Sequence, residues 1–300
     1  MMIENYLLEE LITFAHEHTL AKTAVALNVT QPTITRGMQK LETMLNVHLF
    51  DRQPNRITLT PTGQLAAQEA ELLLAQQRAF VTKIQNYAQS LVTLNAETTL
   101  PGPLALLSYL KKALPDTLQV NPALITIDQI TDHLINRQAN FIFSNQEILT
   151  TDIESRFIGS ENLVVHLQKF MYRANQLSIT FEELQGMSFV VLSAIGIWKD
   201  IIQQAIPDAK FLYQPQRTAF TEITKYSDFP YFSTNFTALE REQRIDTNDN
   251  DNRVAIPISN DRAHMPIYVN YLVSNRQSLM PLFKQFEAAW PTTMKKSSTL

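Results

Sequence analysis

A row of polar side chains between residues 30 and 45 carries groups that can read the edges of nucleic-acid bases. The row consists of Gln31, Thr33, Thr35, Arg36, Gln39 and Lys40. A glutamine amide can pair with adenine through two hydrogen bonds, an arginine guanidinium can do the same with guanine, and a threonine methyl can contact thymine. These residue types predict a surface for the major groove of DNA. An ordinary amphipathic helix with a polar exposed face is the alternative.

The same segment holds an apolar row that predicts one buried helix face. Its members recur at helical spacing and are Ile34, Met38, Leu41 and Leu45. We expect the Thr30 hydroxyl to cap this helix and Pro32 to lie in its first turn, where a missing N–H costs little.

Two shorter helices are predicted before it. The first covers Tyr6 to Phe14, and the second begins near Leu20 with a buried face that we expect to contain Ala24, Val25 and Leu27. Asn28 and Val29 then form a tight turn. A short helix, a turn and a capped helix together favour a helix-turn-helix.

A turn signal, Pro54-Asn55, separates two short extended stretches within residues 51–59. This arrangement predicts a small hairpin, or wing. Arg52 and Arg56 flank the turn and suit contact with phosphate or with the minor groove. A loop that merely joins two helices is the alternative.

The charge is unevenly distributed along the chain. The net charge is −4 over the 300 residues, yet residues 20–58 are net positive. The basic residues of that stretch are Lys22, Arg36, Lys40, Arg52 and Arg56, against Glu42 and Asp51. A local basic patch matters more for nucleic-acid binding than the sum does. An accidental imbalance on a solvated surface is the alternative reading.

Composition excludes several classes of protein. An apolar content of 45% indicates a folded chain, and the length predicts two or three folding units. The absence of cysteine excludes disulfides, thiolate metal sites and cysteine redox sensors. We find no secretory signal and no apolar run near the roughly 20 residues of a membrane span. A soluble cytoplasmic protein without membrane contact is therefore expected.

A long helix is predicted from Pro61, after a Thr60 cap, to about Gln89, which makes a rod of about 40 Å. A partial heptad seam runs along it, comprising Leu73, Phe80, Ile84 and Tyr87 with Ala70 and Gln77 as weaker members. Such a rod would expose these side chains, which favours a partner helix. Packing against the chain's own C-terminal part is the alternative.

Strands and helices alternate after residue 90, which predicts an α/β architecture with parallel sheets. The predicted strands are 91–95, 118–124, 141–143, 163–165, 189–192, 210–213, 231–232, 254–256 and 267–273. Because it contains Pro122, we expect the second of these to be an edge strand. The predicted helices are 104–114, 127–137, one after Trp198, and a last one with Leu279, Leu282, Phe283, Phe286 and Trp290 on one face.

Ligands of such sheets bind at the carboxyl ends of the strands. That rule selects Ala96, Glu97, Thr98, Thr99, Thr126, Ser144, Asn145, Ser193, Ala194, Ile195, Thr234 and Asn235. Many are hydroxyl residues at predicted helix N-termini, which favour an anion and predict a small carboxylate effector. Simple helix caps are the alternative. The acidic stretch 246–253 lacks the glycine and terminal glutamate of a calcium loop, so we expect no metal.

An enzyme is not supported by any motif. The sequence contains no G-x-S-x-G, phosphate loop or H-E-x-x-H, and it has only six glycines, so neither catalysis nor a nucleotide cofactor is expected. A solute-binding protein would explain the α/β part but not the N-terminal segment. A DNA-binding protein without any effector stays open.

The N-terminal residues resemble those of LysR-type transcription regulators. The resemblance covers residues 20–63 and is carried by Ala24, Leu27, Val29-Thr30-Gln31-Pro32, Ile34, Thr35-Arg36, Leu41-Glu42, Leu49-Phe50-Asp51-Arg52 and Leu59-Thr60-Pro61-Thr62-Gly63. It implies DNA contacts by Gln31, Pro32, Thr35 and Arg36 and by Arg52 and Arg56 of the wing. The sequence departs from the family pattern at Thr30, Thr33 and Thr35, where serine or alanine is commoner. This departure puts the base preference of the protein in doubt.

The resemblance also implies an organisation for the whole chain. It predicts a winged helix-turn-helix over 1–60, a linker and dimerisation helix over 61–90, and an effector domain over 91–300 that resembles periplasmic binding proteins. One lobe of that domain would cover about 91–160 and 270–291, and the other about 161–269. A homodimer through the linker helix, a tetramer, a double-stranded DNA operator, a small-molecule effector and RNA polymerase are the partners it implies.

Overall fold

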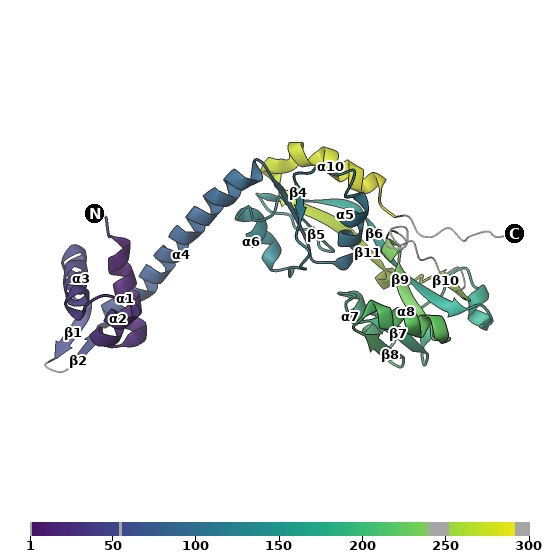
Figure 1. Cartoon of the computed structure of the whole chain (residues 1–300), viewed down its shortest axis with the longest axis horizontal. Helices are drawn as coiled ribbons and strands as arrows, with labels where there is room; N and C mark the ends of the chain where they lie inside the picture. The colour runs from purple at the N-terminus through teal and green to yellow at the C-terminus, as the bar shows by residue number, and fades with distance from the viewer. Residues whose placement is uncertain (1, 54–55, 238, 240–251, 292–300) are drawn as a thin grey trace. The chain divides into compact units, whose positions relative to one another are not determined.

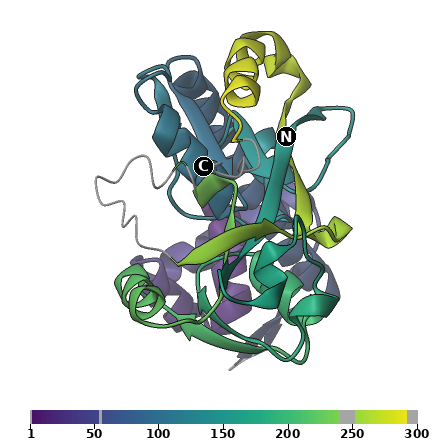
Figure 2. The ribbon, with the colours of Figure 1, turned by 90° about the vertical axis from the view of Figure 1, so that its right-hand side faces the viewer.

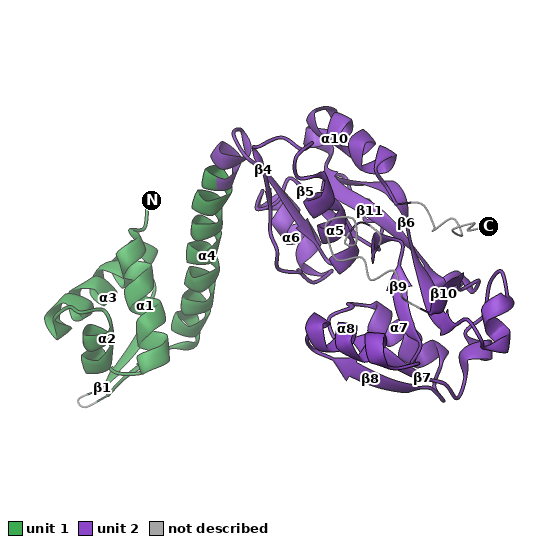
Figure 3. Cartoon of the chain, turned by 45° about the vertical axis from the view of Figure 1, so that its right-hand side comes forward, with its two compact units in different colours: residues 1–85 green, residues 86–300 purple. Residues whose placement is uncertain are grey.

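The structure is a computed structural model that describes residues 2–53, 56–237, 239 and 252–291. The chain divides into two compact units, residues 1–85 and 86–300 (Figure 3). Each unit has its own buried core. No helix in the described ranges combines the length and the apolar character that a membrane span requires.

The first unit contains three helices, a hairpin and most of a long fourth helix (Figure 1). These elements are α1 (Asn5–Glu17), α2 (Leu20–Ala26), α3 (Gln31–Leu45), β1 (Phe50–Gln53), β2 (Arg56–Leu59) and α4 (Pro61–Ser90). Apolar side chains from α1, α3, β1 and α4 form one core. Within it, the ring of Phe14 meets that of Phe50 edge to face at 5.4 Å, so α1 is packed directly against the hairpin.

The predicted inward face of α3 is confirmed, because Ile34, Met38 and Leu41 are buried and Leu45 is partly buried. Two local expectations were wrong. The Thr30 hydroxyl caps no backbone N–H and instead contacts the Thr33 hydroxyl at 2.9 Å. On α2, Val25 is 82% exposed whereas Thr23 is fully buried, because the Thr23 hydroxyl is satisfied by donating to the Thr19 carbonyl.

The predicted wing is present as an antiparallel hairpin, in which Phe50 pairs with Leu59 and Gln53 with Arg56. Its turn at residues 54–55 lies outside the described residues. The Thr60 hydroxyl accepts a hydrogen bond from the Gly63 N–H and so caps α4, as expected. Ala70 is buried against the first core, so its assignment to an exposed heptad seam was wrong.

The second unit is built on a nine-stranded mixed sheet in the order β4-β3-β5-β11-β6-β9-β7-β8, with β10 paired to β6. Its strands are β3 (Leu94–Thr98), β4 (Leu118–Val120), β5 (Phe141–Ser144), β6 (Ile153–Gln168), β7 (Ser188–Leu192), β8 (Lys210–Gln214), β9 (Tyr231–Thr234), β10 (Arg253–Pro257) and β11 (His264–Leu272). The α-helices are α5 (Pro101–Leu110), α6 (Gln129–Ile135), α7 (Trp198–Ala205), α8 (Arg217–Tyr226) and α10 (Arg276–Ala288). Short 3-10 turns are η1 (Tyr172–Asn175), η2 (Glu182–Leu184), η3 (Asp261–Ala263) and η4 (Val273–Asn275).

Two lobes share the two longest strands of this sheet. In one lobe β3 pairs in parallel with β4 and β5, and in the other β7 pairs in parallel with β8 and β9. The antiparallel pair β6 and β11, teal and yellow-green in Figure 2, connects them. The expectation of purely parallel sheets was therefore wrong for the connecting strands. The edge position of β4 is confirmed.

One strand boundary and one helix also differ from the sequence-based prediction. The first strand begins at Leu94 rather than Leu91, because α4 continues to Ser90 and a turn follows it. Leu91 and Val92 are consequently 69% exposed. Helix α8 was missed altogether. None of its residues is fully buried.

Candidate nucleic-acid interface

Helices α2 and α3 are joined by a turn that fixes the direction in which α3 leaves it. Asn28 adopts a left-handed conformation with φ of 54°, and the Val29 N–H bonds to the Ala24 carbonyl at 2.9 Å. Asparagine tolerates this conformation better than most residues. The turn and the buried face of α3 together determine which side chains the helix presents to solvent.

The exposed face of α3 contains most of the predicted polar row. Gln31, Pro32, Thr33, Arg36, Gln39 and Lys40 are exposed. Thr35 is half-buried, and its hydroxyl donates to the Gln31 carbonyl at 3.1 Å, so that donor is engaged by its own helix. Arg36 forms no ion pair with any residue in the described ranges, which leaves its guanidinium available to a ligand.

Lys40 is held by the N-terminal segment rather than projecting alone. Its ammonium donates to the Glu4 carboxylate and to the Tyr6 hydroxyl, the latter at 3.1 Å, and lies 5.5 Å from the centre of the Tyr6 ring. The hydrogen bond to Glu4 raises the pKa of Lys40 and lowers the pKa of Glu4. Because all these groups are exposed, the pair is readily exchanged for another anion.

The two wing arginines differ in their surroundings. Arg52 Nη2 lies 3.0 Å from Glu42 Oε2 on α3, whereas Arg56 is exposed and has no ion pair among the described residues. Glu42 also accepts hydrogen bonds from the N–H groups of Leu49 and Phe50, at 2.8 and 3.1 Å. One carboxylate thus connects α3 to the first strand of the wing. Sequence reasoning assigned Glu42 no such role, since its partners lie seven to ten residues away.

The predicted effector residues of the first lobe gather at the carboxyl ends of three neighbouring strands. The Ile125 N–H bonds to the Thr98 carbonyl, and the Thr99 N–H bonds to the Phe143 carbonyl, which brings the segments of Thr126 and Ser144 beside β3. The prediction that Ala96, Glu97 and Thr98 follow the first strand was wrong, because all three lie within β3 and are buried.

Most hydroxyls of this group are already engaged within the chain. The Thr98 hydroxyl bonds to both the N–H and the carbonyl of Leu100. The Ser144 hydroxyl donates to the Gln146 carbonyl and accepts from Asn270, and the Thr126 hydroxyl donates to Gln129. Helix α5 begins with Pro101 and Pro103, which have no N–H, so its N-terminus is a poor anion site.

The second lobe contributes loops that approach the first. Ser193 and Ala194 are exposed and Ile195 is half-buried in the segment before α7. Next to them, a Cβ built at Gly196 would lie 3.1 Å from Pro101 Cδ. Thr234 is half-buried at the end of β9. Asn235 is buried, accepts from the Asn162 N–H and donates to the carbonyls of Ser160 and Pro291.

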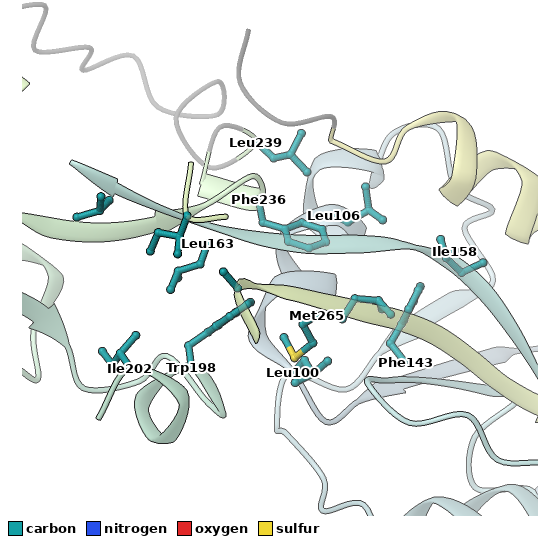
Figure 4. Close-up of a cluster of buried hydrophobic side chains, with 14 of the residues drawn as sticks. Leu100, Leu106, Phe143, Ile158, Leu163, Trp198, Ile202, Phe236, Leu239 and Met265 are labelled. Atoms are coloured by element: carbon teal, nitrogen blue, oxygen red, sulfur yellow. The ribbon is translucent and has the colours of Figure 1, made fainter. Parts of the chain in front are cut away.

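The junction of the lobes is lined by packed apolar side chains (Figure 4). Residues from both lobes belong to one buried cluster, including Leu100, Leu163, Trp198, Phe236 and Met265. Beside this cluster the buried carboxyl group of Glu161 lies near Gly102, where a Cβ would approach Oε2 to 2.8 Å. Among the described residues, no group of three or more metal-ligating side chains is brought together.

Comparison with known proteins bears on the first unit most strongly. Residues 7–64 match the family model described as bacterial regulatory helix-turn-helix protein, lysR family. GltR of Bacillus subtilis, a helix-turn-helix transcriptional regulator, is 40% identical over 68 residues, which is 23% of each chain. The uncharacterised regulator YbhD of Escherichia coli is 23% identical over 206 residues, covering 66% of this chain and 63% of YbhD. These matches therefore span less than two thirds of either relative.

Among solved structures, DarR of Vibrio fischeri in complex with DNA resembles the whole chain in fold. The alignment covers 95% of this chain and 100% of DarR, with a TM-score of 0.58 and 18% sequence identity. The proteins named here are transcription regulators rather than enzymes. Residues 7–64 therefore resemble the helix-turn-helix of lysR-family bacterial regulators, and the whole chain, with its long α4 and its two-lobed unit, shares the fold of DarR.

Proposed function

We propose that this protein binds a double-stranded DNA operator through α3 and the wing and thereby regulates transcription. The exposed row on α3 supports this most, with at its centre the guanidinium of Arg36, which has no ion pair in the part of the chain that the structure describes. Amide, hydroxyl and guanidinium groups on one helix face supply direct base readout, and Arg56 supplies phosphate contact. A regulator of bacterial genes would work in the cytoplasm.

Selection of bound fragments from the source genome, followed by affinity measurement on the recovered duplex, tests this function. Arg36→Ala should weaken specific binding by about 1–3 kcal/mol if Arg36 makes a bidentate base contact. Arg262→Ala removes an equally exposed arginine from the second unit and serves as the matched control. Equal affinity of Arg36→Ala and the parent for the operator would remove Arg36 from the interface.

We further propose that α4 joins two copies of the chain. Its apolar side chains at heptad spacing are exposed, with 51% of Leu73, 66% of Phe80, 54% of Ile84 and 46% of Tyr87 accessible. Exposed apolar residues on a regular stripe are a typical helix–helix interface. Phe80→Glu should lower the molar mass measured by light scattering, whereas Glu69→Lys on the same helix should not. That measurement also separates a dimer from a tetramer.

We also propose that the second unit is a small-molecule sensor, and that its ligand contacts the loops at the junction of the two lobes. The convergence of the segments after β3, β4, β5 and β7 supports this, while the engaged hydroxyls and the two prolines at the start of α5 disfavour an anion there. A thermal-shift panel of organic acids, amines and neutral metabolites tests it, because a ligand of the native state raises the melting temperature. A flat response would favour a regulator without an effector.

A further inference from the structure

A carboxyl group is buried directly beneath α3. Glu10 projects from α1, its residue is 5% exposed, and its Oε2 has no hydrogen-bond partner among the described residues. Buried carboxylates are normally paired, because removing the charge from water is costly. The neutral acid is the form that this environment accommodates.

The space for this carboxyl exists because residue 37 of α3 is glycine. A Cβ built at Gly37 would overlap Glu10 Oε2 and would lie 2.7 Å from Cδ. Glycine within a helix is unfavourable by about 1 kcal/mol relative to alanine. Its position between Arg36 and Met38 places the Glu10 carboxyl against the backbone of the helix that carries the proposed DNA-contacting row.

Among the described residues, none of the charged and titratable groups of the first unit bonds to Oε2. These groups are Glu4, Tyr6, Glu9, His16, Glu17 and His18 on or beside α1, Lys22 on α2, Arg36, Lys40 and Glu42 on α3, His48, Asp51, Arg52 and Arg56 in or beside the hairpin, and Glu69, Glu71, Arg78 and Lys83 on α4. Lys40 is engaged by Glu4 and Tyr6, and Glu42 by Arg52 and the wing backbone. Burial alone raises the pKa of Glu10 to about 7.

We propose that Glu10 is a positioning residue for α3. As the neutral acid, Glu10 holds α3 in the position that binds DNA, and this contact is lost when Glu10 ionises. A carboxylate at this place must gain water, and water reaches Oε2 only if α1 and α3 separate or the side chain leaves Gly37. The negative phosphates of bound DNA favour the same neutral form. Operator binding is then accompanied by proton uptake, and by linkage a lower pH strengthens binding.

The inference rests on the proposed DNA binding and predicts a specific pH profile. With a pKa of about 7, roughly nine-tenths of the Glu10 side chains are neutral at pH 6 and roughly one-tenth at pH 8. If only the neutral form is competent, the apparent Kd of the parent chain rises about tenfold over this range, in inverse proportion to the competent fraction.

Glu10→Gln is the matched variant, because glutamine has the same size and is always neutral. We would measure the affinity of the full chain for the duplex recovered by genomic selection at pH 6, at constant ionic strength, in steps from pH 6 to pH 8. The two proteins differ only at residue 10, so the ratio of the two Kd values isolates Glu10. Gly37→Ala, which expels the carboxyl into solvent, is the second variant.

We expect the Kd of the parent divided by the Kd of Glu10→Gln to rise about tenfold from pH 6 to pH 8. The Kd of Gly37→Ala divided by the Kd of Glu10→Gln should not change with pH. A constant parent-to-variant ratio, with operator binding intact in both, overturns the role of Glu10 while leaving the proposed function standing. A ratio that falls with pH overturns it equally. Failure of the parent to retain any duplex at pH 6 overturns the DNA-binding function, and the inference with it.

Discussion

The guanidinium of Arg52 in the wing lies 3.0 Å from the carboxylate of Glu42 on α3, and this carboxylate also accepts two backbone N–H groups of the wing. The Glu42 side chain therefore links α3 to the wing through three polar contacts. An arginine that the sequence suggests for DNA contact is, in the unbound chain, part of this link.

Glu42→Ala should destabilise the wing by about 1–3 kcal/mol, because two part-buried N–H groups lose their acceptor. Hydrogen exchange of the Leu49 and Phe50 amides in the full chain measures this directly. Glu69→Ala, an exposed glutamate on α4, is the control and should leave these amides unchanged. Unchanged protection in Glu42→Ala would show that strand pairing alone holds the wing.

Glu4→Gln should increase the salt dependence of DNA binding. The change frees the Lys40 ammonium from its carboxylate partner, and one additional phosphate contact steepens the slope of log K against log salt by about 0.9. Affinity titrations at several salt concentrations provide the slope. Glu9→Gln, which removes an exposed charge from the same helix without touching Lys40, tests for a general charge effect. Equal slopes in both variants would place Lys40 outside the interface.

The first unit should lose stability as the pH rises toward neutrality. The pKa of Glu10 is raised to about 7 from its ordinary 4.5, so between these values the folded chain keeps a proton that the unfolded chain has lost. At about 1.36 kcal/mol per pH unit, the decrease amounts to about 3 kcal/mol and is complete above pH 7. Hydrogen exchange of the α1 and α3 amides, relative to Glu10→Gln, measures it. A pH-independent difference between the two proteins would contradict the buried neutral acid.

Asn235→Ala should destabilise the second unit by about 1–3 kcal/mol, since the buried Asn162 N–H and two carbonyls lose their partner. Trp290 and Trp198, both in this unit, report its unfolding by fluorescence. Gln146→Ala, with an exposed side chain, should have little effect. A variant of normal stability that fails in ligand-induced thermal shift would instead support contact between Asn235 and an effector.

The first unit was predictable because its signals are local. The spacing of Ile34, Met38 and Leu41 defined the buried face of α3, and Pro54-Asn55 located a hairpin whose strands are observed. Capping was less predictable. The Thr30 hydroxyl had several acceptors and donors within reach, and it contacts Thr33 rather than a backbone N–H.

Contacts between residues that are distant in the chain could not be predicted from the sequence. Nothing in the order of residues joins Glu42 to the Leu49 amide or Glu10 to Gly37, although a glycine inside a helical pattern is a signal that some neighbour approaches closely. In the second unit, the start of β3 was misplaced because Leu91 and Val92 are apolar but exposed. Because β3 begins later than predicted, Ala96 and Thr98 lie within the strand rather than after its end.

The sharing of β6 and β11 by both lobes has a mechanical consequence. Because each strand is continuous from one lobe into the other, the lobes cannot separate without breaking the ladder between them. Their mutual angle therefore depends on the twist and bend of this two-stranded ribbon, and an irregular register such as that between Ile267 and Tyr268 bends a strand and increases its twist. The local geometry of β11 at this position thus contributes to the angle at which the two lobes stand.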